Sequence, residues 1–341
     1  MDLMYELRKD PILVRWVIVA KTSRTSLSNY LVDDEKPDYQ LTCSFCRGKE
    51  SDTPPEIMAI RAPGSKPNSP DWFTRVIPDS IPVFSIESEL NRQGIGMYDK
   101  IDGIGASEII IESPEHHITS GGMDAEQVTR VLLTYKERIL DLENDPRLRY
   151  ILISKNYGRA AGALYSHPYS HLIASPVIPQ RIKQELEGAK QYFSLKERCV
   201  FCDIIREEER TAARIIFENK NFVAFCPFAP AFPFEVWIMP RRHSCAFQET
   251  DKADLEDFGL AIINVLNKLK KLFKDPPYNL ILHTAPNRMS RRDHWQTINE
   301  DFHWHAEIVP RLGGFTGFEW STGFYILNTS PEEGAKYLKE V

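Results

Sequence analysis

Residues 167–176 read HPYSHLIASP, and residues 302–311 read FHWHAEIVPR. In each stretch histidine or tyrosine side chains alternate with other residues before an apolar run, a pattern typical of a strand that presents polar groups on one face. Each stretch also closes a longer series of similar elements. The chain therefore contains an internal repeat, and these two stretches are its corresponding strands.

The repeat runs through most of the 341 residues. Each half starts with a Cys-x-x-Cys pair, at 43–46 or at 199–202. An apolar strand follows, and then a second strand that begins at Glu108 in one half and at Glu235 in the other. A helical stretch and two further strands complete each half. The order of elements is the same in both.

Apolar spacing predicts one long helix in each half, over 124–143 and over 251–273. Asp124 and Asp251 stand where each helix begins, and their carboxylates are suited to cap it. The strands are short and are punctuated by proline or glycine. Antiparallel strands combined with one long helix per repeat indicate an α+β fold.

We expect two domains, at 1–178 and 199–341, joined by a linker at 179–198. The linker reads PQRIKQELEGAKQYFSLKE from its first residue and is predicted to be helical. The segment 86–105 has no counterpart in the second half and contains four glycines, so it is predicted to be a surface excursion.

Composition narrows the possible functions. The net charge of −6 argues against a general nucleic-acid binder, because no excess of basic residues is available to neutralise phosphates. No stretch approaches 18 apolar residues, so no membrane span is predicted. The first residues, MDLMYELRKDPILVRW, lack the apolar core of a signal peptide. The expected location is the cytoplasm.

The cysteines of the two Cys-x-x-Cys pairs are candidate metal ligands, because such pairs in a chain without a secretion signal indicate metal binding before disulfides. Each half also offers two histidines. The predicted Cys2His2 sites are Cys43, Cys46, His116 and His167 in the first half, and Cys199, Cys202, His243 and His303 in the second. Zinc is the expected ion at both sites, iron is the alternative at the second, and His117 is the alternative to His116.

The sequence resembles galactose-1-phosphate uridylyltransferases, which belong to the histidine-triad superfamily. HPYSHLIASP after NYGRAAGALYS is similar to the active-site stretch of that family, whose core is His-Pro-His-x-Gln. The likeness extends through RWVIVA, CSFC, RVIPDSIPVFS, ESPEHH, FHWHAEI and GFEWSTGFYI, and so covers essentially the whole chain. It implies two tandem histidine-triad-like domains, each an antiparallel sheet with a long helix, and a homodimer with active sites near the subunit interface.

The resemblance implies nucleotidyl transfer from a nucleotide sugar to a sugar phosphate. In that family a histidine attacks the α-phosphorus and forms a covalent nucleotidyl-enzyme, which the second substrate then resolves. His167 falls on the first histidine of the motif, a zinc ligand in zinc-bearing relatives. Asn156, Gly158 and Gly162 fall on positions around the phosphate, and Glu319 falls on a hexose-contacting position.

Several positions depart from the family pattern. Tyr169 stands where the family has its nucleophilic histidine, and His171 stands where a glutamine donates to the phosphate. Asp79 replaces an asparagine expected to contact uridine. Arg24 is the nearest candidate for the phosphate-binding arginines of the N-terminal region, and Tyr325 replaces a hexose-binding glutamine.

Three hypotheses follow. In the first, the chain is a nucleotidyltransferase, or a related ADP-glucose or dinucleotide phosphorylase, with Tyr169 or His171 as nucleophile or general base. His171 lies two residues along the same strand and faces the same side as Tyr169. In the second, the chemistry moves to His305, the repeat equivalent of Tyr169, whose alternative role is that of a metal or structural ligand. In the third, the chain binds a nucleotide or nucleotide sugar without covalent catalysis.

Overall fold

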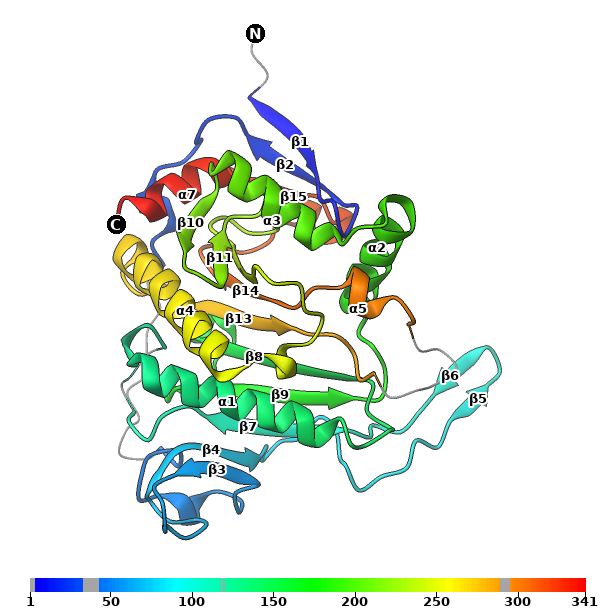
Figure 1. The fold of residues 1–341 in the computed structure, drawn as a ribbon, viewed down its shortest axis with the longest axis vertical. Coiled ribbons are helices and arrows are strands. Elements are labelled where there is room, and N and C mark those ends of the chain that lie inside the picture. The colour runs from blue at the N-terminus through cyan, green and yellow to red at the C-terminus, as the bar shows by residue number, and fades with distance from the viewer. Residues whose placement is uncertain (1–3, 33–42, 117, 119, 289–294) are drawn as a thin grey trace.

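The computed structural model describes residues 4–32, 43–116, 118, 120–288 and 295–341. Its core is a ten-stranded antiparallel sheet with the strand order β10-β11-β12-β14-β13-β8-β9-β7-β4-β3 (Figure 1). The strands of this sheet are β3 (Met58–Arg61), β4 (Trp72–Pro78), β7 (Ala106–Ile111), β8 (Tyr150–Tyr157), β9 (Tyr169–Ser175), β10 (Ile215–Glu218), β11 (Phe222–Phe225), β12 (Val236–Pro240), β13 (Tyr278–His283) and β14 (His305–Pro310).

The two repeats meet edge to edge in this sheet. Strand β8 of the first repeat pairs antiparallel with β13 of the second, with Tyr157 opposite Tyr278. Each repeat contributes five of the strands, and the order in one half mirrors that in the other. The α+β fold with two histidine-triad-like units is therefore confirmed, while the domain limits at 178 and 199 stay a prediction.

Two long helices cover one face of the sheet, and both were predicted. They are α1 (Ala125–Leu142) and α4 (Lys252–Phe273), which pack against each other. The Asp124 carboxylate accepts the Gln127 backbone N–H, and Asp251 accepts that of Asp254, so both caps form as expected. Strand residues that face these helices, such as Ile110 and Ile238, are fully buried.

The other face of the second half is covered by α2 (Gln180–Lys196), which confirms the predicted linker helix. Helix α3 (Val200–Thr211) was not predicted. It begins directly after its N-cap residue Cys199, so the second Cys-x-x-Cys pair occupies a helical first turn instead of a loop. The short helix α5 (Ile298–Asp301) packs beside α2.

A smaller sheet lies at the end of the molecule that carries the second repeat (Figure 1). Its strands are β1 (Tyr5–Lys9), β2 (Trp16–Ala20) and β15 (Tyr325–Leu327), with β2 and β15 parallel. Helices α6 (Gly317–Thr322) and α7 (Pro331–Lys339) flank β15 in the sequence.

The 3-10 helices are η1 (Leu27–Tyr30), η3 (Glu50–Asp52), η4 (Ser120–Gly122), η5 (Arg159–Ala161) and η6 (Phe247–Glu249).

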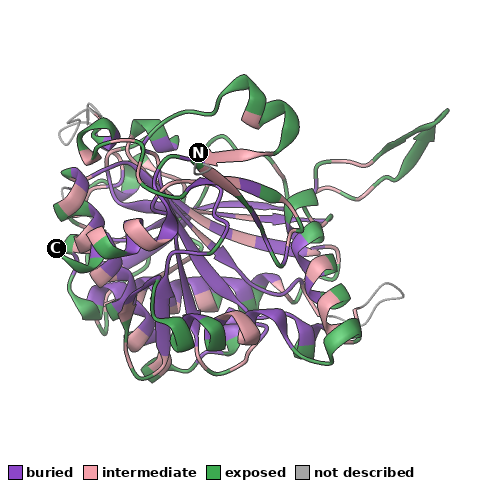
Figure 2. Ribbon diagram, turned by 90° about the horizontal axis from the view of Figure 1, so that it is seen from above, coloured by how far each residue is buried: buried purple, intermediate pink, exposed green. Residues whose placement is uncertain are grey.

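The excursion predicted at 86–105 forms a projecting hairpin of β5 (Gln93–Ile95) and β6 (Tyr98–Lys100). Every residue of both strands is exposed, and Figure 2 shows the hairpin standing away from the buried sheet. None of the helices in the described ranges is both long and apolar enough to cross a membrane.

The structure corrects the expected equivalence of Glu108 and Glu235. Glu108 lies on the helix-covered face, where Arg138 of α1 donates to both carboxylate oxygens at 2.6 and 2.8 Å. Glu235 precedes β12 and accepts the Trp237 indole N–H at 3.0 Å. Trp237 belongs to the core on the opposite face. Because adjacent strand residues point to opposite faces, the alignment by glutamates was wrong by one position.

We expect Asp124→Ala to lower the stability of the chain by about 1 kcal/mol, because the Gln127 N–H loses its acceptor at the start of α1. Asp124→Asn keeps an acceptor oxygen, so its free energy of unfolding should stay within about a few tenths of a kcal/mol of the wild-type value. The midpoint of thermal unfolding by circular dichroism checks the difference. Equal midpoints for both variants would contradict a capping role.

Candidate active site and metal centres

The first Cys/His cluster assembles as predicted, from the loop before β3, the segment after β7 and the start of β9. Cys43, Cys46, His116 and His167 each offer a ligand atom, and these atoms lie within 4.8 Å of one another. The Cys46 Sγ is 3.3 Å from His116 Nδ1 and 3.7 Å from His167 Nδ1. The Nε2–H of His167 donates to the Ser113 carbonyl at 2.7 Å, which leaves Nδ1 as the coordinating atom. His117 lies outside the described residues.

The second cluster has the same composition. Cys199, Cys202, His243 and His303 offer ligand atoms within 4.8 Å of one another. The Cys202 Sγ is 3.3 Å from His243 Nδ1 and 3.5 Å from His303 Nδ1. The Nε2–H of His243 donates to the Asn299 carbonyl at 2.8 Å. Both clusters can hold a metal ion with four ligands, which leaves no open coordination position for a substrate.

A third cluster, which sequence analysis did not find, lies between α2 and the second half of the sheet. Glu185 Oε2 is 2.9 Å from His283 Nδ1, and Glu185 Oε1 is 3.4 Å from His305 Nε2. All three side chains are buried, and their ligand atoms lie close enough to share a metal ion. Glu185 gave no signal in the sequence, because it is one of several charged residues on an amphipathic helix.

The surroundings of His305 bear on the hypothesis that places catalysis at this residue. Its ring is fully buried and stacks on Trp237 at 5.1 Å and on His283 at 4.7 Å between ring centroids. Burial lowers its pKa to about 4, with Glu185 opposing the shift. A nucleotide sugar has no access to a ring enclosed in this way, so the geometry favours the metal-ligand or structural role.

Tyr169 at the start of β9 is also buried, at 1% exposure. Its hydroxyl oxygen accepts the Leu164 backbone N–H at 3.0 Å. Its ring lies 5.9 Å from Phe45 and 5.5 Å from Tyr165 between centroids. Burial raises the pKa of Tyr169, and the backbone N–H groups of Leu164 and Tyr165 partly oppose the shift. Tyr169 therefore fastens the 158–168 loop to the sheet.

His171 lies beside Tyr169 on the same face, as predicted, with ring centroids 5.0 Å apart. Its side chain retains 18% exposure, and its Nδ1 lies 3.9 Å from the Asp79 Oδ2 at the end of β4. Burial lowers the pKa of His171 below its ordinary value of 6.5, and the Asp79 carboxylate opposes that shift. The imidazole is therefore neutral near pH 7 and has a carboxylate beside one nitrogen.

The predicted phosphate-binding positions continue this face onto the next strand. Ser154 of β8 pairs with His171, and Asn156 lies two residues further along. Gly158 and Gly162 bound a tight turn with φ of 81° and 86°, a conformation that favours glycine. Asn279 of β13, which sequence analysis missed, donates from Nδ2 to Asn156 Oδ1 at 2.7 Å and to the Ala161 carbonyl. The second repeat thus supports the turn of the first.

Two predicted site residues lie elsewhere. The backbone N–H of Arg24 donates to the Asn328 carbonyl just after β15, and Glu319 forms a capping box in α6 with Thr316. Figure 1 shows β15 and β2 beside the second repeat, whereas β9 lies in the half of the large sheet that belongs to the first repeat. The predicted site residues therefore form two groups that lie apart within one chain. One group contains Arg24, Glu319 and Tyr325, and the other contains His171, Asp79 and Asn156.

Comparisons with known proteins agree on one family. The sequence profile of the galactose-1-phosphate uridyl transferase N-terminal domain matches residues 6–249, and that of the C-terminal domain matches 185–335. The chain is 36% identical to the ADP-glucose phosphorylase of Arabidopsis thaliana, over 98% of this chain and 93% of that protein. It is 27% identical to the galactose-1-phosphate uridylyltransferase of Thermotoga maritima, over 99% and 98% of the two chains.

Solved structures give the same result. The Arabidopsis thaliana ADP-glucose phosphorylase with bound ADP-glucose superimposes with a TM-score of 0.81 at 34% identity, covering 99% of each chain. A uridylyltransferase structure superimposes with a TM-score of 0.74 at 26% identity, covering 98% of this chain and 97% of that one.

We expect the pKa of His171 to lie below 6.5, because burial disfavours the imidazolium. Replacing Asp79 by asparagine removes the carboxylate that raises this pKa, so the pKa should fall further in Asp79→Asn. Two-dimensional NMR of carbon-13-labelled histidine, with the signal assigned through His171→Gln, measures both values. A rise of the pKa in Asp79→Asn would show that the carboxylate does not act on the ring.

Proposed function

The chain belongs to the galactose-1-phosphate uridylyltransferase family, and from this we propose that it transfers a nucleotidyl group from a nucleotide sugar to a sugar 1-phosphate. The observation that carries the proposal is the open face of the first repeat. There His171, Asp79 and Asn156 meet beside the turn between Gly158 and Gly162. Such a turn leaves room for a phosphate to approach the backbone.

We propose His171 as the nucleophile. Its Nδ1 faces Asp79, so Nε2 is the nitrogen that attacks the α-phosphorus. The new P–N bond forms as the bond from that phosphorus to the bridging oxygen breaks, and sugar 1-phosphate leaves with the electron pair. The proton stays on Nδ1, where the Asp79 carboxylate stabilises the positive charge that develops on the ring. The acceptor oxygen then attacks phosphorus, and the P–N bond breaks to restore a neutral imidazole.

Tyr169 is a weaker candidate for this step. Its hydroxyl is buried and already accepts the Leu164 N–H. A phenol must also lose its proton before attack, and its ordinary pKa is about 10. We therefore assign Tyr169 to positioning: it holds the loop that leads into the phosphate site.

The substrate that accepts the nucleotidyl group distinguishes two related activities. A sugar 1-phosphate as acceptor gives uridylyltransferase-type exchange, whereas orthophosphate gives phosphorolysis. The 36% identity to an ADP-glucose phosphorylase favours keeping the second activity as the alternative. Both share the first half-reaction at His171, so the residue assignment does not depend on the outcome.

We further propose that a second copy of the chain completes the site. The Arg24 guanidinium suits a phosphate and the Glu319 carboxylate suits sugar hydroxyls; Arg24 follows β2 and Glu319 lies in α6, away from His171. A homodimer that brings this part of one subunit to the open face of the other would unite the two groups of residues.

We propose zinc for the two Cys2His2 clusters, because two thiolates and two imidazoles suit its preference for four soft or borderline ligands. Iron is the alternative ion at the second of these clusters, and the carboxylate and two imidazoles at Glu185 also suit it. When bound, zinc would tie loops to the sheet and take no part in the transfer. We propose the cytoplasm as the location, where thiols stay reduced and can serve as metal ligands.

Incubation with UDP-glucose and with ADP-glucose, each labelled in the nucleotide, tests the transfer step. We expect quenching in mildly alkaline denaturant, which preserves the acid-labile P–N bond, followed by peptide mass mapping, to find the nucleotide on His171. His171→Ala should lose the adduct and at least about 10²-fold in turnover. Tyr169→Phe keeps the ring and should retain turnover within about tenfold, a cost of about 1.4 kcal/mol. Supplying galactose 1-phosphate or orthophosphate to the labelled enzyme identifies the acceptor.

An adduct on Tyr169 would overturn the assignment of His171 while leaving the transfer intact. Absence of both adduct and exchange with either nucleotide sugar would overturn the transferase proposal in favour of a binding protein.

Metal content tests the proposed zinc sites. Cys46→Ser should reduce bound zinc by one ion per chain, as measured by mass spectrometry of the purified protein, because one thiolate of the first cluster is lost. The thermal midpoint should fall with it. Cys226→Ala changes a buried cysteine outside the clusters and should leave the zinc content unchanged. Equal zinc in Cys46→Ser and wild type would contradict the site.

A further inference from the structure

A row of three polar side chains crosses the boundary between the two repeats beside the glycine turn. Arg311 directly follows β14, Asn279 lies in β13 and Asn156 lies in β8. Asn279 pairs with Asn156, and Asn156 is two residues along β8 from Ser154, which pairs with His171. All of these side chains therefore take the same sheet face. Asn279 is buried, whereas Asn156 and Arg311 are half-buried. The row thus runs from the second repeat to the edge of the transfer site.

The hydrogen bonds of Asn279 have a fixed direction, because the groups at its two ends cannot exchange roles. A guanidinium has only donors, and the Arg311 Nε–H donates to the Asn279 Oδ1 at 2.5 Å. A backbone carbonyl only accepts, and the Ala161 carbonyl takes a hydrogen bond from the Asn279 Nδ2 at 2.9 Å. Reversing the Asn279 amide would set two donors against each other at one end and two acceptors at the other. Its orientation is therefore determined at both ends.

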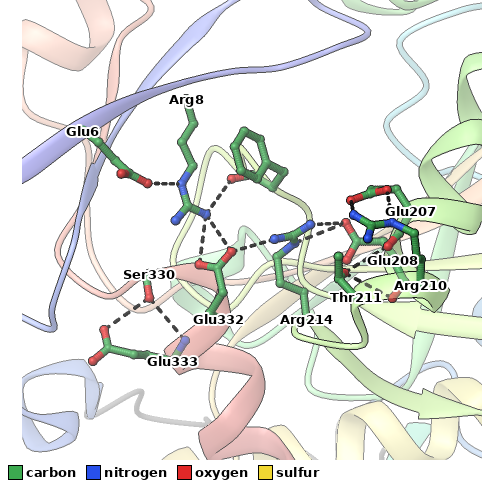
Figure 3. Close-up of polar contacts among 11 residues, drawn as sticks. Glu6, Arg8, Glu207, Glu208, Arg210, Thr211, Arg214, Ser330, Glu332 and Glu333 are labelled. Atoms are coloured by element: carbon green, nitrogen blue, oxygen red, sulfur yellow. Dashed lines mark hydrogen bonds and ion pairs between the residues drawn. The ribbon is translucent and has the colours of Figure 1, made fainter.

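Arg311 holds this position without an ion pair. Its guanidinium carbon lies 4.5 Å from the centroid of the Phe232 ring, which supports it from one side. Within the described ranges it pairs with no carboxylate. Arg8 and Arg214 of the same half of the molecule differ, since both donate to the Glu332 carboxylate (Figure 3). The Arg311 guanidinium is thus directed at a neutral amide where other arginines have a charged partner.

The fixed Asn279 amide in turn sets the direction of the Asn156 amide. The Asn279 Nδ2 donates to the Asn156 Oδ1 at 2.7 Å, so the Asn156 oxygen faces the second repeat. The Asn156 Nδ2 then lies toward the glycine turn, where a Cβ at Gly162 would approach it to 4.0 Å. This nitrogen is not buried and has no partner among the residues that the structure describes. Its N–H groups are therefore open to a substrate.

Amide direction matters for the ligand that this face is expected to bind. The oxygens of an ionised phosphate only accept hydrogen bonds, and bonds to such charged acceptors are stronger than those between neutral groups. In the observed direction Asn156 offers the phosphate a donor. In the reversed direction it would place a carbonyl oxygen against the negative charge.

We propose that Asn279, anchored by Arg311 and by the Ala161 carbonyl, is a positioning residue of the transfer site that turns the Asn156 NH2 group toward the phosphate of the nucleotide sugar. The inference rests on the proposed function for the identity of the ligand. It gives the second repeat a part in substrate binding, although neither Asn279 nor Arg311 touches the substrate.

Neutron diffraction of the ligand-free, deuterated chain tests the amide directions directly. We expect deuterium on the Asn156 nitrogen beside the turn and on the Asn279 nitrogen that faces Asn156. In Asn279→Asp the new carboxylate is ionised beside Arg311 and has no donor, so the Asn156 amide should reverse. A wild-type Asn156 whose oxygen faces the turn, or an Asn156 amide that keeps its direction in Asn279→Asp, would overturn the inference.

Calorimetric titration with UDP-glucose and ADP-glucose measures the consequence for binding, using the full chain with His171→Ala to prevent transfer. Asn279→Asp should weaken binding about tenfold or more, because Asn156 then turns an oxygen toward the phosphate. In an Asn156→Ala background the same charge is added but no amide remains to reverse, so Asn279→Asp should lose most of its effect. This background is the matched control for charge and for any general loss of structure. Equal effects in both backgrounds would exclude the positioning role.

The two measurements separate this inference from the proposed function. Amides oriented as proposed, in a chain that performs no nucleotidyl transfer, would overturn the proposed function alone. Transfer by a chain whose Asn156 oxygen faces the turn would overturn the inference alone. Binding of neither nucleotide sugar to the His171→Ala chain would overturn both.

Discussion

Strands β8 and β13 pair antiparallel from Tyr157 opposite Tyr278 to Ile153 opposite Leu282. This pairing joins two half-sheets of equal size into one sheet and brings α1 and α4 against each other on one face. It also places Asn279 of the second repeat where its amide supports Asn156 and the turn of the first. The first repeat does not build its site alone, because its glycine turn rests on a side chain of the second.

The sheet face on the side away from α1 and α4 is accessible in the first repeat and covered in the second. In the first, His171 stays accessible at the end of the row that begins with Ile77. In the second, α2 lies over the corresponding row, with Arg181 near Glu307 and Glu185 between two histidines. Glu185 and Glu307 are buried carboxylates, and His283 and Arg181 beside them offset the cost of burying that charge. A cavity survives beyond this cluster, where Phe225 and Trp237 extend the same face.

The sequence predicted local features well and their relative placement less well. Capping aspartates and apolar spacing located α1 and α4 almost to the residue, because these signals act within one helical turn. The Cys-x-x-Cys pairs and histidines located two clusters, because ligand chemistry restricts residue type strongly. The glutamate alignment was wrong by one residue, since spacing along a chain does not report which face of a strand a side chain takes.

Other features had no local signal. Glu185 is one charge among many on a polar helix until β13 and β14 set histidines against it. Arg24 and Glu319 are separated from His171 because of where the smaller sheet packs. That packing depends on contacts between residues distant in the sequence, which no short pattern encodes.

Three departures from the family pattern, at positions 79, 169 and 171, have a common explanation in the fold. In the proposed transfer, a histidine at position 171 needs a group that stabilises its positive charge once phosphorus is attached, and the carboxylate at position 79 lies 3.9 Å from its Nδ1. An asparagine there would supply a dipole where a charge is needed. Tyr169, released from attack, gains a hydroxyl that reaches the Leu164 N–H and orders the loop. We therefore propose that the substitutions at 79, 169 and 171 are interdependent, and that the reactive group lies two residues further along the same strand face than in the family pattern.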